Sequence, residues 1–256
     1  MAGTLIPALA LAVIGWIDDR RGLPVSVRLI GFSGICLLAS VNANFSVHFL
    51  LAAFVLLVLI NVTNFMDGID GIVVVEFVPM LITFSALAVL GLFGEMLGAL
   101  AIALAGGLLG FFCFNRPKAK IFLGDSGSLV VGFLAGVFLL EITRQNGWLA
   151  AIILPAYFLA DAGLTLLRRA MRRERVWRAH RDHFYQQAFD SGQSNWSIIL
   201  RVLLCNVALC AFAYMTMGAP LHLAIIALAA SGAIVALLLH SLYRPSRIVA
   251  TPEDAR

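Results

Sequence analysis

The sequence predicts an all-α protein, a polytopic bundle of transmembrane helices. Of its 256 residues, 61% are hydrophobic and only 12% are charged, and the mean hydropathy is +0.97. Soluble domains carry about 25% charged residues, so this composition excludes a water-soluble domain, a disordered chain and a disulfide scaffold. The apolar runs are continuous and lack the alternation of barrel strands, and only helices or closed barrels satisfy the backbone in lipid. The four cysteines lie inside such runs without metal-ligand spacing.

Nine apolar runs are long enough to cross about 30 Å of hydrocarbon as helices. The first, 2–17, lacks the basic region and cleavage site of a signal peptide, and we interpret it as a retained span. No repeat or linker divides the chain, so we expect one membrane domain, 1–256, with one long cytoplasmic loop at about 168–196. The other predicted spans are 25–42, 47–63, 72–92, 96–114, 127–143, 147–167, 197–217 and 220–243.

The basic residues determine the expected orientation. Consecutive spans alternate in direction, so the connections after odd-numbered spans share one side of the membrane. That side carries 17 of the 18 Lys and Arg residues, and the opposite side carries only Arg144. By the positive-inside rule we expect the N-terminus outside, and the odd-span loops and the C-terminus in the cytoplasm. Topology accounts for the net charge of +4, so the charge does not require a nucleic-acid partner.

Two adjacent carboxylates, Asp18 and Asp19, end the first span. The negative end of the helix dipole disfavours them there, and they repel each other, so another group should compensate for their charge. A solvated loop tip paired with Arg20 or Arg21 and a role in handling metal or phosphate both stay open for this pair.

The connection after the third span is rich in oxygen donors. Asn61 and Asn64 are followed by Asp67 and Asp70, and a glycine comes after each carboxylate. This composition lets the backbone turn tightly and direct oxygen ligands to one point. An ordinary Asp-Gly turn is the alternative, although such a turn does not need two amides and two carboxylates beside an apolar span.

The connection before the sixth span joins basic residues to a carboxylate. Arg116, Lys118 and Lys120 precede Asp125 and Ser126 at a predicted helix N-terminus, which favours anions. A carboxylate beside such a site is what a Mg²⁺ ion bridging phosphates requires. Alternatively, Asp125 or Ser126 is simply the N-cap of the next helix.

The long arginine-rich loop contains His180, Arg181 and His183. Topology or contact with anionic lipid explains the arginines. The histidines have no role in topology, and histidine can donate to phosphate or move protons near neutral pH.

Two further acids lie within predicted spans and are functional candidates for that reason. Asp161 has local pairing with Arg168 or Arg169 as its alternative, and Glu76 is close enough to the interface to be solvated.

Taken together and in order, these motifs resemble those of the polyprenyl-phosphate N-acetylaminosugar-1-phosphate transferase superfamily, glycosyltransferase family 4. The resemblance covers about residues 5–190 and rests on the Asp18-Asp19 pair, 64–71, 114–128 and the histidine loop. That loop is closer to the O-antigen-initiating undecaprenyl-phosphate N-acetylglucosamine-1-phosphate transferases than to the muramoyl-pentapeptide branch, which has consecutive histidines. The family's N-terminal cytoplasmic loop and the two helices around it are absent, so we expect a chain that folds but transfers slowly.

The resemblance implies a role for each motif residue. Asp125 matches the Mg²⁺-binding aspartate, with Asp67 as a further ligand and Mn²⁺ as an alternative metal. Asp18 matches the carboxylate that deprotonates or positions the lipid phosphate, and Phe122 matches an aromatic ring that stacks on uracil. The implied catalytic residues are Asp18, Asp19, Asp67, Asp70 and His183, and the implied substrate-binding residues are Asn64, Asn115, Lys118, Lys120, Phe122, His180 and Arg181.

The implied reaction is attack of an undecaprenyl-phosphate oxygen on the β-phosphorus of a UDP-N-acetylaminosugar, with release of UMP. Its place would be the cytoplasmic face of a bacterial inner membrane, in a monomer or a homodimer. A secondary transporter is the main alternative, but transporter sites lie near the bilayer midplane, and the acids here gather at one interface. A CDP-alcohol phosphatidyltransferase would have Ala-Arg shortly after the first Asp-Gly, where this chain has 72–75, four apolar residues.

Overall fold

The computed structural model describes residues 2–42, 48–175 and 180–243, and within these ranges the chain forms helices and no strand. The all-α prediction is therefore confirmed. The helices are α1 (Ala2–Arg21), α2 (Val25–Asn42), α3 (Phe49–Met66), α4 (Ile72–Val89), α5 (Glu95–Asn115), α6 (Gly124–Arg144), α7 (Trp148–Ile153), α8 (Ala156–Met171), α9 (Phe184–Asp190), α10 (Asn195–Thr216) and α11 (Leu221–Leu242).

Six of these helices, α3 to α6 together with α10 and α11, are long and apolar enough to cross a membrane, and the apolar helix 25–41 is somewhat shorter. The chain is thus a multi-helix membrane protein, but the prediction of nine spans is not confirmed. The run at 147–167 is divided, because α7 ends at Ile153 and α8 starts after Pro155. Proline lacks a backbone donor, and its ring disfavours helical geometry in the residue before it.

The loop expected at 168–196 is largely helical instead. Helix α8 continues to Met171, α9 follows, and α10 begins at Asn195. Arg168 helps to fold this segment back, because its guanidinium lies 4.4 Å from the ring centroid of Phe184 and 5.0 Å from that of Tyr243. Residues 176–179, which belong to this predicted loop, lie outside the described ranges.

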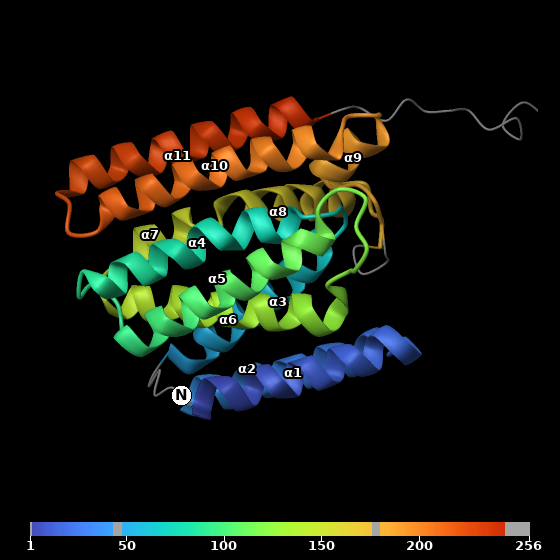
Figure 1. Ribbon diagram of the computed structural model, residues 1–256, viewed down its shortest axis with the longest axis horizontal. Helices are drawn as coiled ribbons and strands as arrows, with labels where there is room; N and C mark the ends of the chain where they lie inside the picture. The colour runs from blue at the N-terminus through green and yellow to red at the C-terminus, as the bar shows by residue number, and fades with distance from the viewer. Residues whose placement is uncertain (1, 43–47, 176–179, 244–256) are drawn as a thin grey trace, which may run out of the picture.

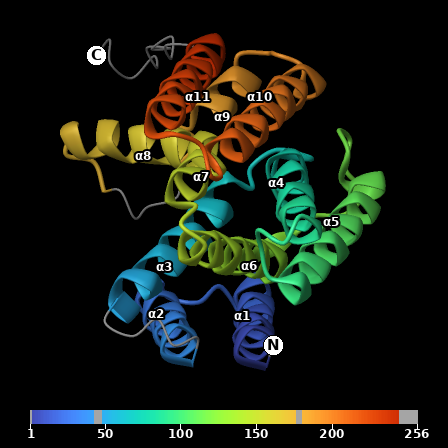
Figure 2. The ribbon, with the colours of Figure 1, turned by 90° about the vertical axis from the view of Figure 1, so that its left-hand side faces the viewer.

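The long helices lie side by side, with α1 and α2 on one flank and α10 and α11 on the other (Figure 1). Seen from one end, α6 lies inside the bundle (Figure 2), where it packs against both α1 and α3, while α4 packs against α5 and α10. The connections α1–α2, α3–α4 and α5–α6 lie at one end together with α9 (Figure 1). The acidic motifs therefore gather at one end of the bundle, as predicted, and the membrane side of that end stays a prediction.

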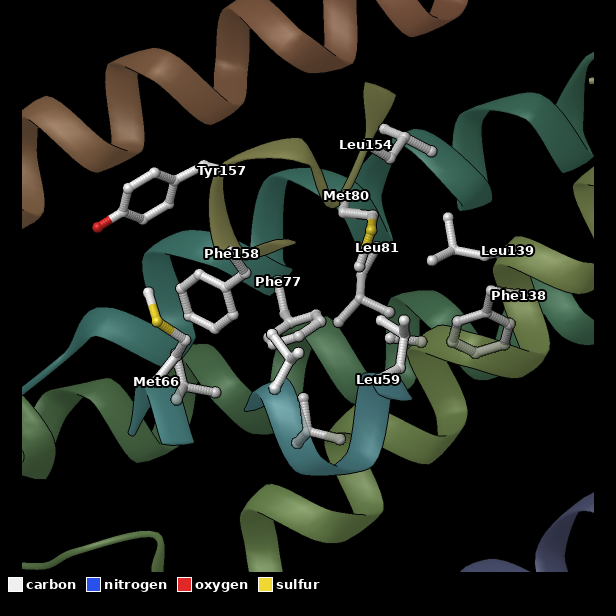
Figure 3. Packing of buried hydrophobic residues seen from close by; sticks show 14 of the residues in the cluster. Leu59, Met66, Phe77, Met80, Leu81, Phe138, Leu139, Leu154, Tyr157 and Phe158 are labelled. Atoms are coloured by element: carbon white, nitrogen blue, oxygen red, sulfur yellow. The ribbon is translucent and has the colours of Figure 1, made fainter. Parts of the chain in front are cut away.

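The apolar core lies between α3, α4, α6 and α8 (Figure 3). Phe77 packs edge-on against Phe158, with ring centroids 5.6 Å apart, and Phe84 packs against Phe138 at 5.4 Å. Close approach of backbones drives helix association in lipid, where apolar burial contributes little. Gly132 allows such an approach between α6 and α3, because a Cβ there would lie 2.7 Å from the carbonyl oxygen of Leu59.

Glu76 is not solvated at the interface, contrary to the expectation from sequence. Its side chain is buried at 2% exposure because α10 packs over α4. Asn206 of α10 donates its amide to Glu76 Oε2 at 2.7 Å and to the Val75 carbonyl oxygen at 3.1 Å. This acid therefore joins two helices.

Glu76→Gln should change the free energy of unfolding little, because glutamine keeps an acceptor for Asn206. Asn206→Ala should lower it by about 1–2 kcal/mol, because it removes the donor of a buried acid. Reversible unfolding in mixed detergent micelles measures both values. A larger loss in Glu76→Gln than in Asn206→Ala would show that this pair is not the stabilising contact.

Candidate active site

Asp19 reaches from the end of α1 to the start of α6. Its Oδ1 accepts the Asp125 backbone N–H at 2.8 Å, and its Oδ2 accepts the Ser126 N–H at 3.1 Å. The sequence expectation that Asp125 or Ser126 is the N-cap is wrong, because the N-cap position belongs to Leu123, which has no side-chain cap. A carboxylate at a helix N-terminus stabilises it by about 0.3–1 kcal/mol when exposed.

Asp18 is buried, with 7% of its surface exposed, and it faces α2. It accepts the Leu23 N–H at 2.6 Å and Arg28 Nη1 at 2.8 Å, so its partner is neither of the arginines that follow it in sequence. Arg28 Nη1 also lies 3.4 Å from Asp125 Oδ2. Arg28 thus connects two acids that the sequence places more than a hundred residues apart.

Sequence reasoning counted Arg28 only toward membrane topology and missed its place beside the acids. A signal was present, since Arg28 is the single charged residue of an otherwise apolar and small-residue helix, α2.

A pocket of about 280 Å³ opens between the α3–α4 and α5–α6 connections. At its edge Asn64 donates its amide to Asp125 Oδ1 at 2.7 Å and to Ser128 Oγ at 3.1 Å. With Arg28 on its other oxygen, the Asp125 carboxylate is held in a fixed orientation. The pocket is lined by Asn64, Asp67, Gly68, Ile69, Asp70, Asn115, Phe122, Leu123, Gly124 and Asp125.

Asp67 follows the last residue of α3 and lines this pocket. Burial, followed by the negative charges of Asp125 and Asp19, raises the pKa of its carboxyl group to about 7. A cation in the pocket would favour the ionised form of this group.

Asp70 and Asn115 hold the two connections together. Asp70 Oδ2 accepts the backbone N–H groups of Lys118 at 3.0 Å and Ala119 at 3.1 Å. Asn115 Oδ1 accepts the Gly71 N–H at 2.9 Å, while its amide donates to a carbonyl of the α5–α6 connection. Both side chains line the pocket, but Asp70 Oδ2 and both polar atoms of Asn115 are engaged by the backbone.

Phe122 is 76% exposed at the pocket, which leaves a ring face available for stacking. Lys118 and Lys120 are exposed on the same connection and are not part of the pocket lining.

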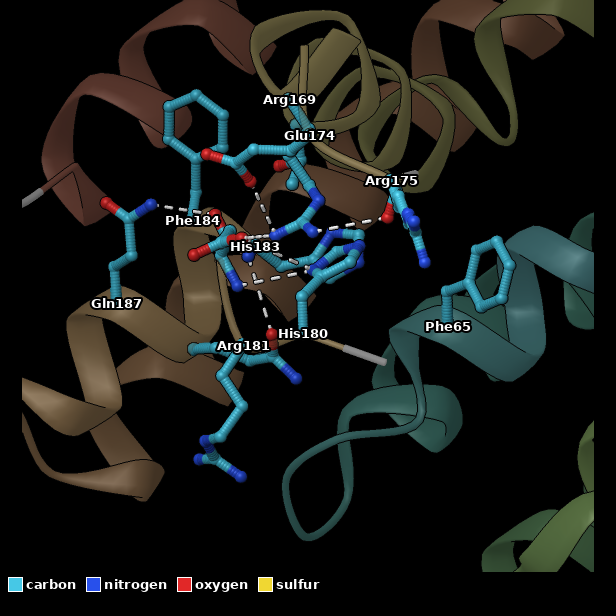
Figure 4. A network of polar contacts seen from close by, with 12 residues as sticks. Phe65, Arg169, Glu174, Arg175, His180, Arg181, His183, Phe184 and Gln187 are labelled. Atoms are coloured by element: carbon cyan, nitrogen blue, oxygen red, sulfur yellow. Dashed lines mark hydrogen bonds and ion pairs between the residues drawn. The ribbon is translucent and has the colours of Figure 1, made fainter. Parts of the chain in front are cut away.

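His183 lies in a polar network with His180 and Arg169 (Figure 4), and its buried side chain contacts Asp161. Its Nδ1 is 3.1 Å from Asp161 Oδ1, and Asp161 also accepts the Phe184 N–H at 3.0 Å. Asp161 therefore pairs with the start of α9 rather than with Arg168 or Arg169, and the local alternative is wrong. The His180 and His183 rings are tilted by 33° against each other, with centroids 5.0 Å apart.

Two arginines of this part of the chain, Arg169 and Arg181, form ion pairs within it. Arg169 bonds to Asp182 and to Glu174 (Figure 4). Arg181 pairs with Asp190 at 2.9 Å. Burial, followed by the neighbouring His183, lowers the pKa of His180 below its usual value.

Neither histidine nor Arg181 lines the pocket. The segment 180–190, which we call the histidine segment, nevertheless contacts the acidic connection between α3 and α4, residues 67–71. The Tyr185 hydroxyl donates to the Phe65 carbonyl oxygen at 3.3 Å, and a Cβ at Gly68 would collide with the same hydroxyl group.

The acids of the pocket suit a hard cation. Within the described ranges no three His, Cys, Asp or Glu side chains are grouped to hold a metal. Mg²⁺ does not require such a cage, because it keeps several waters and binds one or two carboxylates together with substrate phosphates. Asp67, Asp125 and the Asn64 amide offer oxygen donors of this kind around one pocket. This donor set fits Mg²⁺ whose remaining ligands are phosphate and water.

Comparison with known proteins identifies the family of the chain. The profile of glycosyl transferase family 4 matches residues 1–143, more than half of the chain. The chain belongs to glycosyl transferase family 4. The matched part contains every acid of the pocket but not the histidine segment.

Curated relatives include the phospho-N-acetylmuramoyl-pentapeptide-transferases of Streptococcus pyogenes serotype M5 (strain Manfredo) and serotype M49 (strain NZ131). Each is 37% identical over 113 residues, which cover 41% of this chain and 31% of the relative. The family 4 chain thus spans less than a third of the length of these relatives. Both carry the name of the muramoyl-pentapeptide branch, and assignment to the O-antigen branch stays a prediction.

Proposed function

We propose that this family 4 protein transfers the sugar 1-phosphate of a UDP-N-acetylaminosugar to undecaprenyl phosphate. The observation that carries the proposal is the fixed Asp125 carboxylate, which shares a pocket with Asp67 and the exposed ring of Phe122. Family membership and the names of the relatives support the same class of reaction.

In the proposed reaction a lipid-phosphate oxygen forms a bond to the β-phosphorus. The bond between that phosphorus and the bridging oxygen breaks, and UMP leaves with the oxygen. Such transfers need positioning and charge neutralisation rather than covalent chemistry by the protein. Asp67 and Asp125 would hold Mg²⁺, or Mn²⁺, which neutralises the diphosphate when bound.

The remaining residues would bind and orient the substrates. Phe122 would stack on the uracil ring, and Lys118 and Lys120 would attract the nucleotide phosphates from solution. Asp18 would orient Arg28 toward the lipid phosphate. His183 would support the acidic connection through Tyr185, with His180 and Arg181 beside it on the same face.

The proposed site lies at the cytoplasmic face of a bacterial inner membrane, where a membrane lipid and a cytosolic nucleotide can meet. The product would begin an O-antigen or another cell-envelope glycan. A transporter would need an ionisable site near the midplane, whereas the one acid buried along α4, Glu76, is closed off by Asn206.

A panel of sugar nucleotides tests the proposal. The purified chain is incubated with undecaprenyl phosphate, Mg²⁺ and radiolabelled UDP-N-acetylglucosamine, UDP-N-acetylgalactosamine or UDP-N-acetylmuramoyl-pentapeptide. We expect label to pass into the lipid phase with one of the three. Absence of lipid-linked label with all three would overturn the proposed substrate class.

Cysteine reporters test the proposed sidedness. In a cysteine-free background, reporters at Ser126 and Ser191 should react with an impermeant thiol reagent only after the membrane is opened. A reporter at Asn146, in the turn after α6, should react from outside. External labelling at position 126 would separate the site from the cytosolic nucleotide.

The raised pKa of Asp67 predicts a pH-dependent stability. Its folded pKa of about 7 exceeds the usual carboxyl value of 3.8, so the folded state binds the extra proton between these pH values. Stability from this group is present at low pH and is lost as pH rises toward 7. In EDTA, Asp67→Asn should therefore raise Tm at pH 8 by about 2–4 °C, which is roughly 1 kcal/mol at this chain length, and change it little at pH 4.

Melting curves in detergent measure this difference. An Asp67→Asn variant that melts below wild type at pH 8 would show that the carboxylate is stabilised in the folded state rather than destabilised.

A further inference from the structure

Asp19 is outside the pocket lining, yet it contacts the helix that carries Asp125. Both of its oxygens accept backbone N–H groups in the first turn of α6, at 2.8 Å and 3.1 Å. The first amides of a helix have no partner within the helix, so they attract an anion. At the start of α6 that anion is a carboxylate of the protein itself.

Two glycines make room for this contact. A Cβ at Gly15 on α1 would lie 2.6 Å from the Cα and N atoms of Ser126, so the two helices touch through their backbones. Gly124 has φ +66°, which favours glycine, and a Cβ there would lie 2.7 Å from Asp19 Oδ2. The junction is therefore built around the Asp19 side chain.

The same junction explains how two adjacent acids persist at the negative end of α1. Asp18 is compensated by Arg28 and the Leu23 N–H, and Asp19 is compensated by the amides of α6. The two acids point to different partners. Both acids are nevertheless linked to Asp125. Arg28, the partner of Asp18, contacts Asp125 Oδ2, and Asp19 itself accepts the Asp125 backbone N–H.

We propose that Asp19 is a positioning residue, whose carboxylate occupies the N-terminus of α6, keeps substrate phosphate away from it and fixes the Asp125 side chain toward the pocket. This inference rests on the proposed function only in that Asp125 is taken as a Mg²⁺ ligand. The inference requires an acceptor oxygen at position 19. It does not require that this residue transfers a proton or binds the metal.

The test compares Asp19→Asn and Asp19→Ala with wild type and with Glu141→Gln, a control at the opposite end of α6. The first measurement is hydrogen exchange of residues 122–128, without Mg²⁺ or substrate. Asp19→Ala should speed exchange there, and Asp19→Asn should keep most of the protection because asparagine is a good capping acceptor.

The second measurement is the Mg²⁺ concentration that gives half-maximal UMP release. Asp19→Ala should raise it about tenfold or more, which corresponds to about 1.4 kcal/mol, and added Mg²⁺ should restore part of the rate. Asp19→Asn should raise it less, and Glu141→Gln should leave it unchanged. Melting temperatures measured in EDTA separate this effect from a general loss of stability, because bound Mg²⁺ itself stabilises the folded state.

Wild-type exchange in Asp19→Ala would overturn the inference. Loss of transfer in Asp19→Asn as complete as in Asp19→Ala, with protection intact, would overturn it too, because the charge would then be used chemically. If Asp19→Ala does not fold, the comparison of Asp19→Asn with wild type decides alone. If wild type transfers nothing, the proposed function fails, and the exchange data still decide whether Asp19 fixes α6.

Discussion

Asp125→Asn should lower sugar-phosphate transfer by at least about a hundredfold, a rise of ~2.7 kcal/mol in the barrier. Asparagine keeps an oxygen that can accept the Asn64 amide, so the fold and the pocket should persist. What the substitution removes is the negative charge that a Mg²⁺ ion needs. UMP release at saturating substrate measures the loss, with Glu141→Gln on the same helix as the control of unchanged activity.

Stability should separate this effect from misfolding. We expect the melting temperature of Asp125→Asn to stay close to that of wild type in EDTA. Retention of more than about a tenth of the activity, under ~1.4 kcal/mol in the barrier, would remove Asp125 from the set of metal ligands.

Gly15→Ala should disrupt the junction of α1 with α6. The new methyl group would lie 2.6 Å from backbone atoms of Ser126, which cannot rotate away as a side chain can. Helix α1 must shift, and Asp19 then leaves the start of α6. We expect a loss of about 1–3 kcal/mol in the free energy of unfolding and at least about a tenfold loss of transfer.

Gly34→Ala on α2 is the matched control, because no atom lies within 4 Å of its added methyl group. It should be as stable as wild type or slightly more so, since alanine favours helix. Equal stability and activity of the two alanine variants would mean that the helices do not touch at Gly15.

Most of the helices could be predicted from the sequence, because long apolar runs in lipid have no other regular structure available. The structure places α2, α4, α5 and α6 within a few residues of the predicted spans. The seventh predicted span is two helices rather than one, because mean hydropathy does not register the effect of a single proline on the backbone. Pro155 interrupts the helix inside a run that stays apolar throughout.

The candidate site could be predicted in part. The sequence places several acids in connections on one side of the bundle, so they were expected to lie near one another. Asp67, Asp70 and Asp125 do line one pocket. Contacts that depend on tertiary packing were not predictable. The pairing of Asp161 with His183, for example, depends on how α9 folds back on α8. The role of Arg28 depends likewise on the packing of α1 against both α2 and α6.

The central claim is that a sugar phosphate moves to a lipid phosphate at the Asp125 pocket. The most direct measurement uses UDP-N-acetylglucosamine, or whichever sugar nucleotide the panel selects, labelled with ³²P at the β-phosphate, with undecaprenyl phosphate and Mg²⁺. The account predicts that the label enters the lipid, that unlabelled UMP is released in equal amount, and that Asp125→Asn abolishes both. Label left on a released nucleoside diphosphate while the sugar enters the lipid, or transfer that persists in Asp125→Asn, would contradict it.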